Sequence, residues 1–127
     1  LAEKIRAAAY GLGGVLTPTG VGTPMETELD ELGRKKKVVE IEGKKYLLEM
    51  PLHADYSFIR PTVADKFGNF YCAKATKNFN YVMAGAADKT IIAPEKIVEI
   101  GEIDPDMFAV AGVLVDAIAE GEKPWQI

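Results

Sequence analysis

Residues 10–23 read YGLGGVLTPTGVGT, a loop-and-strand segment between a helix-prone start and the strands that follow. Its fourteen residues include five glycines, three threonines and one proline around the apolar pair Val15 and Leu16. Glycine loses much conformational entropy on folding, so this density indicates positive φ angles or a close approach by another group. Threonine hydroxyls beside bare backbone N–H groups can hold an anion or a carbonyl oxygen. A glycine-rich turn at a strand end has the same composition, and both interpretations stay open here.

The composition bears on the class of protein. The chain has 127 residues, enough for one domain that buries its own core. Its 15 basic and 19 acidic residues give a net charge of −4, which argues against a nucleic-acid partner. Residues 10–23 match neither the P-loop pattern nor the dinucleotide-binding glycine pattern. The basic run at residues 34–37 follows an acidic stretch, and we interpret it as a solvated loop rather than a docking patch.

The sequence also predicts where the protein resides. Cys72 is the only cysteine, which excludes an internal disulfide and suits a reducing cytosol. No apolar run reaches the roughly 18 residues of a membrane span. We therefore expect a cytoplasmic protein without a membrane partner. Leu1 is not a start methionine and opens a helical pattern without a capping residue, so we expect a piece of a longer chain.

Short strands alternate with a few helices along the chain. We expect helices at residues 1–9 and 78–88, with Leu1, Ile5 and Ala8 on one face of the first. A short helix or irregular excursion is expected at 24–33, and turns at 65–69 and 104–106. Residues 38–50 have the alternation of a β-hairpin. Further strands are expected at 54–60, 70–72, 90–93, 96–100 and 113–118, followed by a tail at 124–127. This order indicates an α/β or α+β sheet domain.

No set of side chains forms a convincing catalytic machine. His53, the only histidine, lies near Ser57, the only serine, but no nucleophile elbow surrounds that serine, which alternates into a strand interior. We interpret His53 as structural or exposed. One histidine and one cysteine fit no zinc spacing, so no metal site is expected. Cys72 is interpreted as a small buried hydrophobe.

Two other groups of polar residues leave alternatives open. Five acidic residues cluster near a predicted strand end and a turn: Glu95, Glu99, Glu102, Asp104 and Asp106. They can form a solvated rim of carboxylates or contain an acid–base pair, and we favour the rim. Asn78 and Asn80 flank Phe79 at a predicted helix start. Their amides can cap the helix or donate to a ligand carbonyl, and the residue types favour neither.

The sequence resembles the α subunit of family I CoA-transferases, the 3-oxoacid, acetate and butyrate–acetoacetate enzymes of ketone-body and short-chain fatty-acid metabolism. The resemblance begins at residues 1–6 and includes the specific segment TPTGVGT at 17–23. Among its later segments, KNFN at 77–80 is the most specific. The remaining segments follow in the family's order: 11–16, 43–49, 54–55, 64–69, 76–80, 83–84, 86–87 and 97–105.

The resemblance implies a fold, a partner and a reaction. The fold is α/β, an open and mostly parallel sheet flanked by helices. The partner is a similarly folded β subunit, expected in an α2β2 hetero-oligomer. That subunit carries a glutamate in a Ser-Glu-Asn-Gly motif, and CoA moves between carboxylic acids through an acyl anhydride and a glutamyl-CoA thioester on it. CoA thioesters are thus substrates, and no permanently bound cofactor is implied.

This chain lacks the Ser-Glu-Asn-Gly motif and the family's amino-terminal Gly-Gly-Phe segment. The resemblance therefore implies that residues 1–127 are the carboxy-terminal part of an α-subunit domain, truncated at its amino-terminal side. Such a part is expected to have no catalytic residue and to be inactive alone. Departures from the family at residues 8–9, Tyr81 and 110–112 bear on acyl specificity more than on fold.

Substrate-lining residues follow from matching single positions to the family's segments. In the glycine-rich loop, backbone N–H groups and hydroxyls are expected near the acyl end of the site. Asn78 and Asn80 are expected to line the same region or to brace it. The full set is Thr17, Thr19, Gly20, Gly22, Thr23, Asn78 and Asn80. The alternative is a non-catalytic binding or assembly module, in which the glycine-rich segment is a structural turn.

Overall fold

The computed structural model describes residues 1–29, 33–107 and 109–120. The chain divides into two compact units, Leu1–Leu52 and His53–Ile127, and each is described by itself. Among the described residues, no helix is long and apolar enough to cross a membrane. The predicted tail at 124–127 lies outside the described residues.

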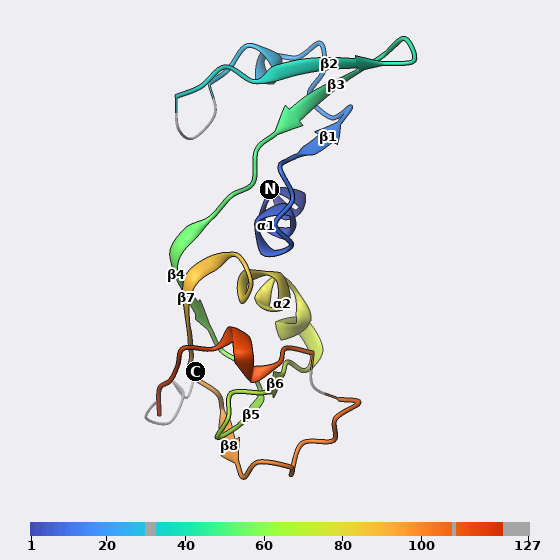
Figure 1. The fold of residues 1–127 in the computed structure, drawn as a ribbon. Helices are drawn as coiled ribbons and strands as arrows, with labels where there is room; N and C mark the ends of the chain where they lie inside the picture. The colour runs from blue at the N-terminus through green and yellow to red at the C-terminus, as the bar shows by residue number, and fades with distance from the viewer. Residues whose placement is uncertain (30–32, 108, 121–127) are drawn as a thin grey trace. The chain divides into compact units, whose positions relative to one another are not determined.

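A three-stranded antiparallel sheet and one helix make up the first unit (Figure 1). Helix α1 spans Ala2–Ala9, as the sequence predicted, and strand β1 spans Val15–Thr17. A short 3-10 helix, η1, spans Pro24–Glu26 within the stretch expected to be helical or irregular. Strands β2, Lys37–Ile41, and β3, Lys44–Glu49, follow. The strand order is β1-β3-β2, so β3 is the central strand.

The predicted hairpin is confirmed. Strands β2 and β3 pair antiparallel, with Val38 opposite Leu47. Glu42 and Gly43 form the two-residue turn with φ angles of 50° and 76°, the left-handed pair that suits the twist of a hairpin. Strand β1 pairs with the other edge of β3, and a Cβ on Gly14 would lie 2.9 Å from Leu48 Cδ1. The close approach expected of the glycine-rich segment is therefore present at Gly14.

The face of α1 that is buried differs from the predicted face. We expected Leu1, Ile5 and Ala8 on one side, but Leu1 is 75% exposed. Lys4, Ala7 and Ala8 are the buried residues of the helix. A lysine takes a buried position because its ammonium group finds a carboxylate partner on β3, a contact that hydrophobic periodicity does not register.

Two small sheets make up the second unit. Strands β4 (Ala54–Ile59), β7 (Ala87–Ile92) and β9 (Ala117–Ile118) form an all-parallel sheet in the order β4-β7-β9. Strand β5 (Val63–Asp65) pairs antiparallel with β6 (Phe70–Tyr71) and parallel with β8 (Lys96–Val98). The strands expected at 54–60, 70–72, 90–93 and 96–100 are confirmed, whereas β5 was not predicted.

An apolar cluster lies between these elements. Ile59 and Ile92 project from the parallel sheet, and small or aromatic residues from the connecting segments cover them. The buried members are Ile59, Ala64, Phe70, Cys72, Ala84, Ile92 and Val110. This cluster is the core of the second unit.

The helix predicted at 78–88 is wrong over most of its length. Residues Lys74–Lys77 form the 3-10 helix η2, and helix α2 spans only Asn80–Met83. The N-cap position is Phe79, without a capping side chain, so neither asparagine caps the helix. The chain becomes strand β7 at Ala87 because that residue pairs with Ala54. The predicted close packing of the small residues is confirmed at Ala84 and Ala86, which are 2% and 5% exposed.

The strand predicted at 113–118 is correct only at its end. Gly112–Leu114 form the 3-10 helix η3, and β9 begins at Ala117. The Gly112 N–H donates to Asn69 Oδ1 at 2.8 Å, and a Cβ at this position would lie 2.5 Å from the Phe67 carbonyl oxygen. This contact with the turn before β6 fixes the backbone in a non-extended form. The predicted turn at 65–69 is confirmed, since Asp65 Oδ1 accepts the N–H groups of Phe67 and Asn69.

Candidate substrate site

A cleft of about 740 Å³ lies in the first unit, between the first turn of α1, strand β1 and η1. Its wall combines aliphatic side chains with a few charged and hydroxyl groups, the composition of many ligand sites. The lining residues are Leu1, Ala2, Glu3, Lys4, Val15, Leu16, Thr17, Thr19, Met25, Lys36 and Glu49. Two of the seven sequence-predicted site residues, Thr17 and Thr19, line this cleft.

Three charged side chains converge in the cleft wall. Lys36 Nζ donates to Glu49 Oε1 at 2.8 Å, and Lys4 Nζ lies 3.7 Å from Glu49 Oε2. The side chains are 9% exposed for each lysine and 15% exposed for the glutamate. Ionised groups with so little access to water are stable only when paired, so this cluster locks α1 and the segment before β2 onto the end of β3.

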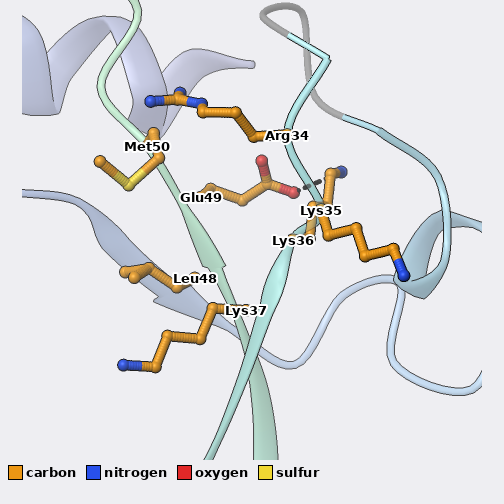
Figure 2. Close-up of a pocket in the computed structure, with 7 residues that line it drawn as sticks. All are labelled: Arg34, Lys35, Lys36, Lys37, Leu48, Glu49 and Met50. Atoms are coloured by element: carbon orange, nitrogen blue, oxygen red, sulfur yellow. Dashed lines mark hydrogen bonds and ion pairs between the residues drawn. The ribbon is translucent and has the colours of Figure 1, made fainter.

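A smaller hollow of about 210 Å³ adjoins the same glutamate and is lined by residues 34–37 and 48–50. Figure 2 shows the Glu49 carboxylate directed at Lys36, and Arg34 and Met50 among the residues that line the hollow. The interpretation of the basic run as a solvated loop is therefore wrong for Lys36, whose side chain is largely buried. Lys35 and Lys37 are exposed, as expected.

A hydrogen bond from a backbone N–H to a side-chain hydroxyl links the two threonines that line the cleft. Thr17 ends strand β1, because Pro18 follows it, and its Oγ1 accepts the N–H of Thr19 at 3.2 Å. Thr17 is half-buried and Thr19 is exposed. The structure thus places one threonine at the end of a strand and one just after it, and both residues line the wall that also carries Lys36 and Glu49.

Gly20, Gly22 and Thr23 form the turn after these threonines and are not part of the cleft wall. Gly20 and Gly22 have φ angles of 90° and 74°, so the predicted need for positive φ is confirmed. The Thr23 hydroxyl donates to the Gly20 carbonyl oxygen at 2.8 Å, and its Oγ1 accepts the N–H of Met25. The Gly22 N–H donates to Glu26 Oε2 at 2.7 Å. Several donors of the loop are therefore satisfied within it.

Asn78 and Asn80 lie in the second unit. Asn78 Oδ1 accepts the N–H of Phe79 at 2.6 Å. Asn80 Nδ2 donates to the Thr76 carbonyl oxygen at 2.9 Å and lies 3.7 Å from Cys72 Sγ. Asn80 is half-buried, and its amide is held against η2. These contacts brace the segment before α2.

The remaining candidates behave largely as expected. His53 is exposed, and Cys72 is fully buried, with burial raising the pKa of its thiol. Ser57 is 4% exposed, and its Oγ has no hydrogen-bond partner among the described residues. The five carboxylates of the expected rim are all exposed. Within the described ranges, no group of three or more potential metal-ligating side chains lies close enough to hold an ion.

Sequence reasoning missed the charged cluster of the cleft. Lys4 was not among the residues expected on the buried face of the first helix, and Lys36 was assigned to a solvated loop. Glu49 gave one signal, since it is the one charged residue within the otherwise apolar segment Leu47 to Met50. The partners of that glutamate are 13 and 45 residues away in sequence, so only the folded chain brings them together.

Comparison with known proteins identifies the family. The family model described as Coenzyme A transferase matches residues 1–121. The probable coenzyme A transferase subunit alpha of Bacillus subtilis is 43% identical over 96% of this chain and 51% of the relative. The acetate CoA-transferase subunit alpha of Escherichia coli K12 is 42% identical over 97% of this chain and 53% of the relative. The chain belongs to the coenzyme A transferase family and resembles α subunits within it.

A solved structure supports the same fold. The acyl-CoA transferase of Escherichia coli O157:H7, in a thioester complex with CoA, aligns with a TM-score of 0.78 at 26% identity. The alignment covers 93% of this chain and 27% of that one. The predicted α/β fold class is confirmed. Strands β4, β7 and β9 supply the all-parallel sheet among the described residues. The chain spans about half the length of the two curated relatives compared above.

Proposed function

We propose that this chain is the substrate-lining part of a CoA-transferase that moves CoA between short-chain carboxylic or 3-oxo acids. The observation that carries the proposal is the family match over residues 1–121, which includes the whole cleft wall. The names of the relatives support the substrate class, since one is an acetate CoA-transferase and another an acetoacetyl-CoA:acetate/butyrate CoA transferase.

The reaction requires a nucleophile from a partner chain. In the proposed mechanism, a glutamate carboxylate of a β subunit attacks the acyl-CoA carbonyl and expels CoA thiolate, leaving an acyl-glutamyl anhydride. The thiolate then attacks the glutamyl carbonyl, which releases the carboxylic acid and forms the glutamyl-CoA thioester. A second acid reverses both steps. We propose that the pair acts in the cytoplasm as an α2β2 hetero-oligomer.

Within this scheme the chain binds and orients the acyl group. We assign substrate contact to Thr17 and Thr19, with Gly20, Gly22 and Thr23 shaping the loop and Asn78 and Asn80 contributing to the same site or bracing it. The Gly22 N–H already donates to Glu26, so the threonine hydroxyls are better placed than that N–H to stabilise a thioester oxyanion. The charged cluster holds the wall on which these hydroxyls lie.

The first experiment is to co-express an α chain that carries this sequence, at the full length of its relatives, with a β subunit. The purified pair is assayed for acetyl-CoA formation from acetate and acetoacetyl-CoA or butyryl-CoA. Borohydride reduction during turnover traps the thioester. We expect turnover and trapping on the β chain. An assembled pair that shows neither with several short acids would overturn the proposal.

Thr19→Val tests the hydroxyl directly in that complex. We expect kcat/KM to fall about fivefold to tenfold, since a neutral hydrogen bond contributes about 1 kcal/mol. Thr27→Val is the matched control because the Thr27 hydroxyl donates to the Pro24 carbonyl oxygen and lies outside the cleft wall. Equal activity of the two variants would exclude a role for the Thr19 hydroxyl.

A non-catalytic binding or assembly module is the alternative function. The internal hydrogen bonds of residues 20–26 favour it, because they are those of a structural turn. An adjacent reading frame that encodes Ser-Glu-Asn-Gly would favour the transferase, and a complex that assembles without turnover would favour the module.

A further inference from the structure

The short 3-10 helix η1 carries a methionine in the wall of the candidate substrate cleft. Met25 is the middle residue of η1, lines the cleft and is 46% exposed. Thr17 and Thr19 line the same wall. A thioether side chain is long, unbranched and polarisable, so it packs well against a flexible aliphatic chain. Met25 therefore offers a ligand the apolar contact that the hydroxyl groups cannot supply.

Hydrogen bonds fix the backbone of η1 on both sides of this methionine. Thr23 is the N-cap, and its Oγ1 accepts the Met25 N–H at 3.3 Å. The Glu26 N–H donates to the Thr23 carbonyl oxygen at 3.0 Å. The Thr27 N–H donates to the Pro24 carbonyl oxygen, also at 3.0 Å. The Met25 side chain thus extends from a backbone that is held in place.

The glycine-rich turn places Met25 beside the end of β1. A Cβ on Gly20 would lie 3.4 Å from Met25 Cβ and 3.1 Å from Leu47 Cδ1. Leu47 is the register partner of Thr17, the last residue of β1. Directly opposed residues of an antiparallel pair project from the same face of a sheet. Met25 therefore lies on the side of the wall that carries Thr17.

The charged groups of the cleft wall are already paired with one another. Lys36 and Lys4 both face Glu49. The Arg6 guanidinium donates two hydrogen bonds to Glu3 Oε2, at 2.9 and 2.7 Å. A second carboxylate on a substrate would have to compete with Glu49 for lysines that have little access to water. Apart from the threonines, the rest of the wall is aliphatic: Leu1, Ala2, Val15, Leu16 and Met25.

We infer that the cleft takes the uncharged, straight acyl chain of a monocarboxylic acid and that Met25 sets the length of that chain. The acyl carbonyl oxygen lies at the threonine hydroxyl groups. The aliphatic chain runs along Met25 and Leu16, which is 40% exposed in the same wall. This inference rests on the proposed transferase function, to which it adds the class of acyl group and a specificity-determining residue.

Opposite changes at Met25 test the inference in the full-length α chain paired with a β subunit. Met25→Ala removes the side chain beyond Cβ, and Met25→Trp fills more of the cleft. The kcat/KM for CoA transfer from acetoacetyl-CoA is measured with acetate, butyrate, hexanoate and succinate as acceptors. Met107→Ala is the matched control, because Met107 is 58% exposed and lies outside the cleft wall.

We expect Met25→Ala to raise the hexanoate-to-butyrate ratio of kcat/KM about tenfold, the effect of a methylene in an apolar pocket. Met25→Trp should raise the acetate-to-butyrate ratio by a similar factor. The parent and the Met107→Ala control should use butyrate at least about tenfold better than succinate. Turnover with ratios that neither Met25 substitution changes, or with equal use of butyrate and succinate by the parent, would overturn the inference and leave the transferase function standing.

The ε-methyl group of Met25 gives a second measurement that needs no turnover. In the complex labelled with carbon-13 at methionine methyl groups, its resonance is identified by its loss in Met25→Ala. Butyrate should shift this resonance, and succinate at the same concentration should not. A complex without turnover in which butyrate alone shifts the resonance would support the site and overturn the transferase function. A resonance that no monocarboxylic acid shifts would overturn the inference.

Discussion

The two units of this chain are stabilised in different ways. In the first unit, buried charge fixes the elements, since Glu49 joins Lys36 and Lys4. Among the residues that the structure describes there, Leu47 is the one large side chain that is fully buried. In the second unit, an apolar cluster around Phe70 and Ile92 unites strands and connections. The ion cluster leaves charged groups in the wall of a cleft, whereas the apolar cluster fills the interior of its unit with packed side chains. The difference places the candidate substrate site in the first unit and the main source of stability in the second.

The largest effect is expected from Phe70→Ala. Phe70 is fully buried, and removing its ring leaves a cavity, so the free energy of unfolding should fall by about 3–5 kcal/mol. Urea denaturation measures the loss, and amide exchange locates it, with β7 expected to lose more protection than β3. Phe58→Ala is the control, because that ring is 70% exposed and should change stability little. A similar loss in both variants would contradict the assignment of the core.

Glu49→Gln tests whether the charged cluster stabilises the first unit, again by urea denaturation and amide exchange. The variant leaves two largely buried lysines without their carboxylate, which should cost about 2–3 kcal/mol. Here amide exchange should quicken in β3 more than in β7. Glu40→Gln, an exposed position on β2, should stay within about 0.5 kcal/mol of the parent chain. If Glu49→Gln were equally mild, the cluster would not hold the cleft wall.

The smallest effect is expected at an exposed ion pair of the second unit. Asp116 accepts from Lys89 Nζ and from the Thr90 N–H, both at 2.8 Å, and these bonds lower the pKa of its carboxyl group. A lowered pKa contributes stability above the ordinary value near 3.8, and this is lost as the pH falls through the folded-state pKa. Melting temperatures of the parent and Asp116→Asn should therefore differ slightly at pH 6 and converge as the pH is lowered below 3.8. Asp55→Asn is the control, and a constant difference across this range would contradict the pairing.

Local patterns predicted the elements that depend on neighbouring residues. The hairpin of β2 and β3 follows from alternation around a Glu-Gly-Lys turn. The turn at 65–69 was predicted from its residue types, and in the structure Asp65 Oδ1 accepts two N–H groups within it. The helix at 78–88 failed because β7 begins at Ala87, where pairing with β4 outweighs the helix propensity of alanine. The strand at 113–118 failed because a contact with Asn69 bends its first half.

The candidate site was predicted in part. Thr17 and Thr19 were found because their hydroxyls lie within a recognisable local segment, and the structure puts both in the cleft wall. The roles of the seven predicted residues stay predictions. The charged cluster was missed, since the position of a buried ion pair depends on which surfaces exclude water, and no local pattern carries that information.

The sequence by itself determined the family, the hairpin, the glycine positions that need left-handed backbone and the alternation of β4. These features depend on single residues or short spacings, where steric and hydrogen-bonding preferences act locally. Only the tertiary structure decided which face of α1 is buried, where β7 begins and which lysines meet Glu49. It also decided that both crossovers cover one face of the parallel sheet and leave Tyr56 and Phe58 exposed. The reason is that burial and strand pairing are set by segments distant in sequence, whose contacts exist only when the whole unit has folded.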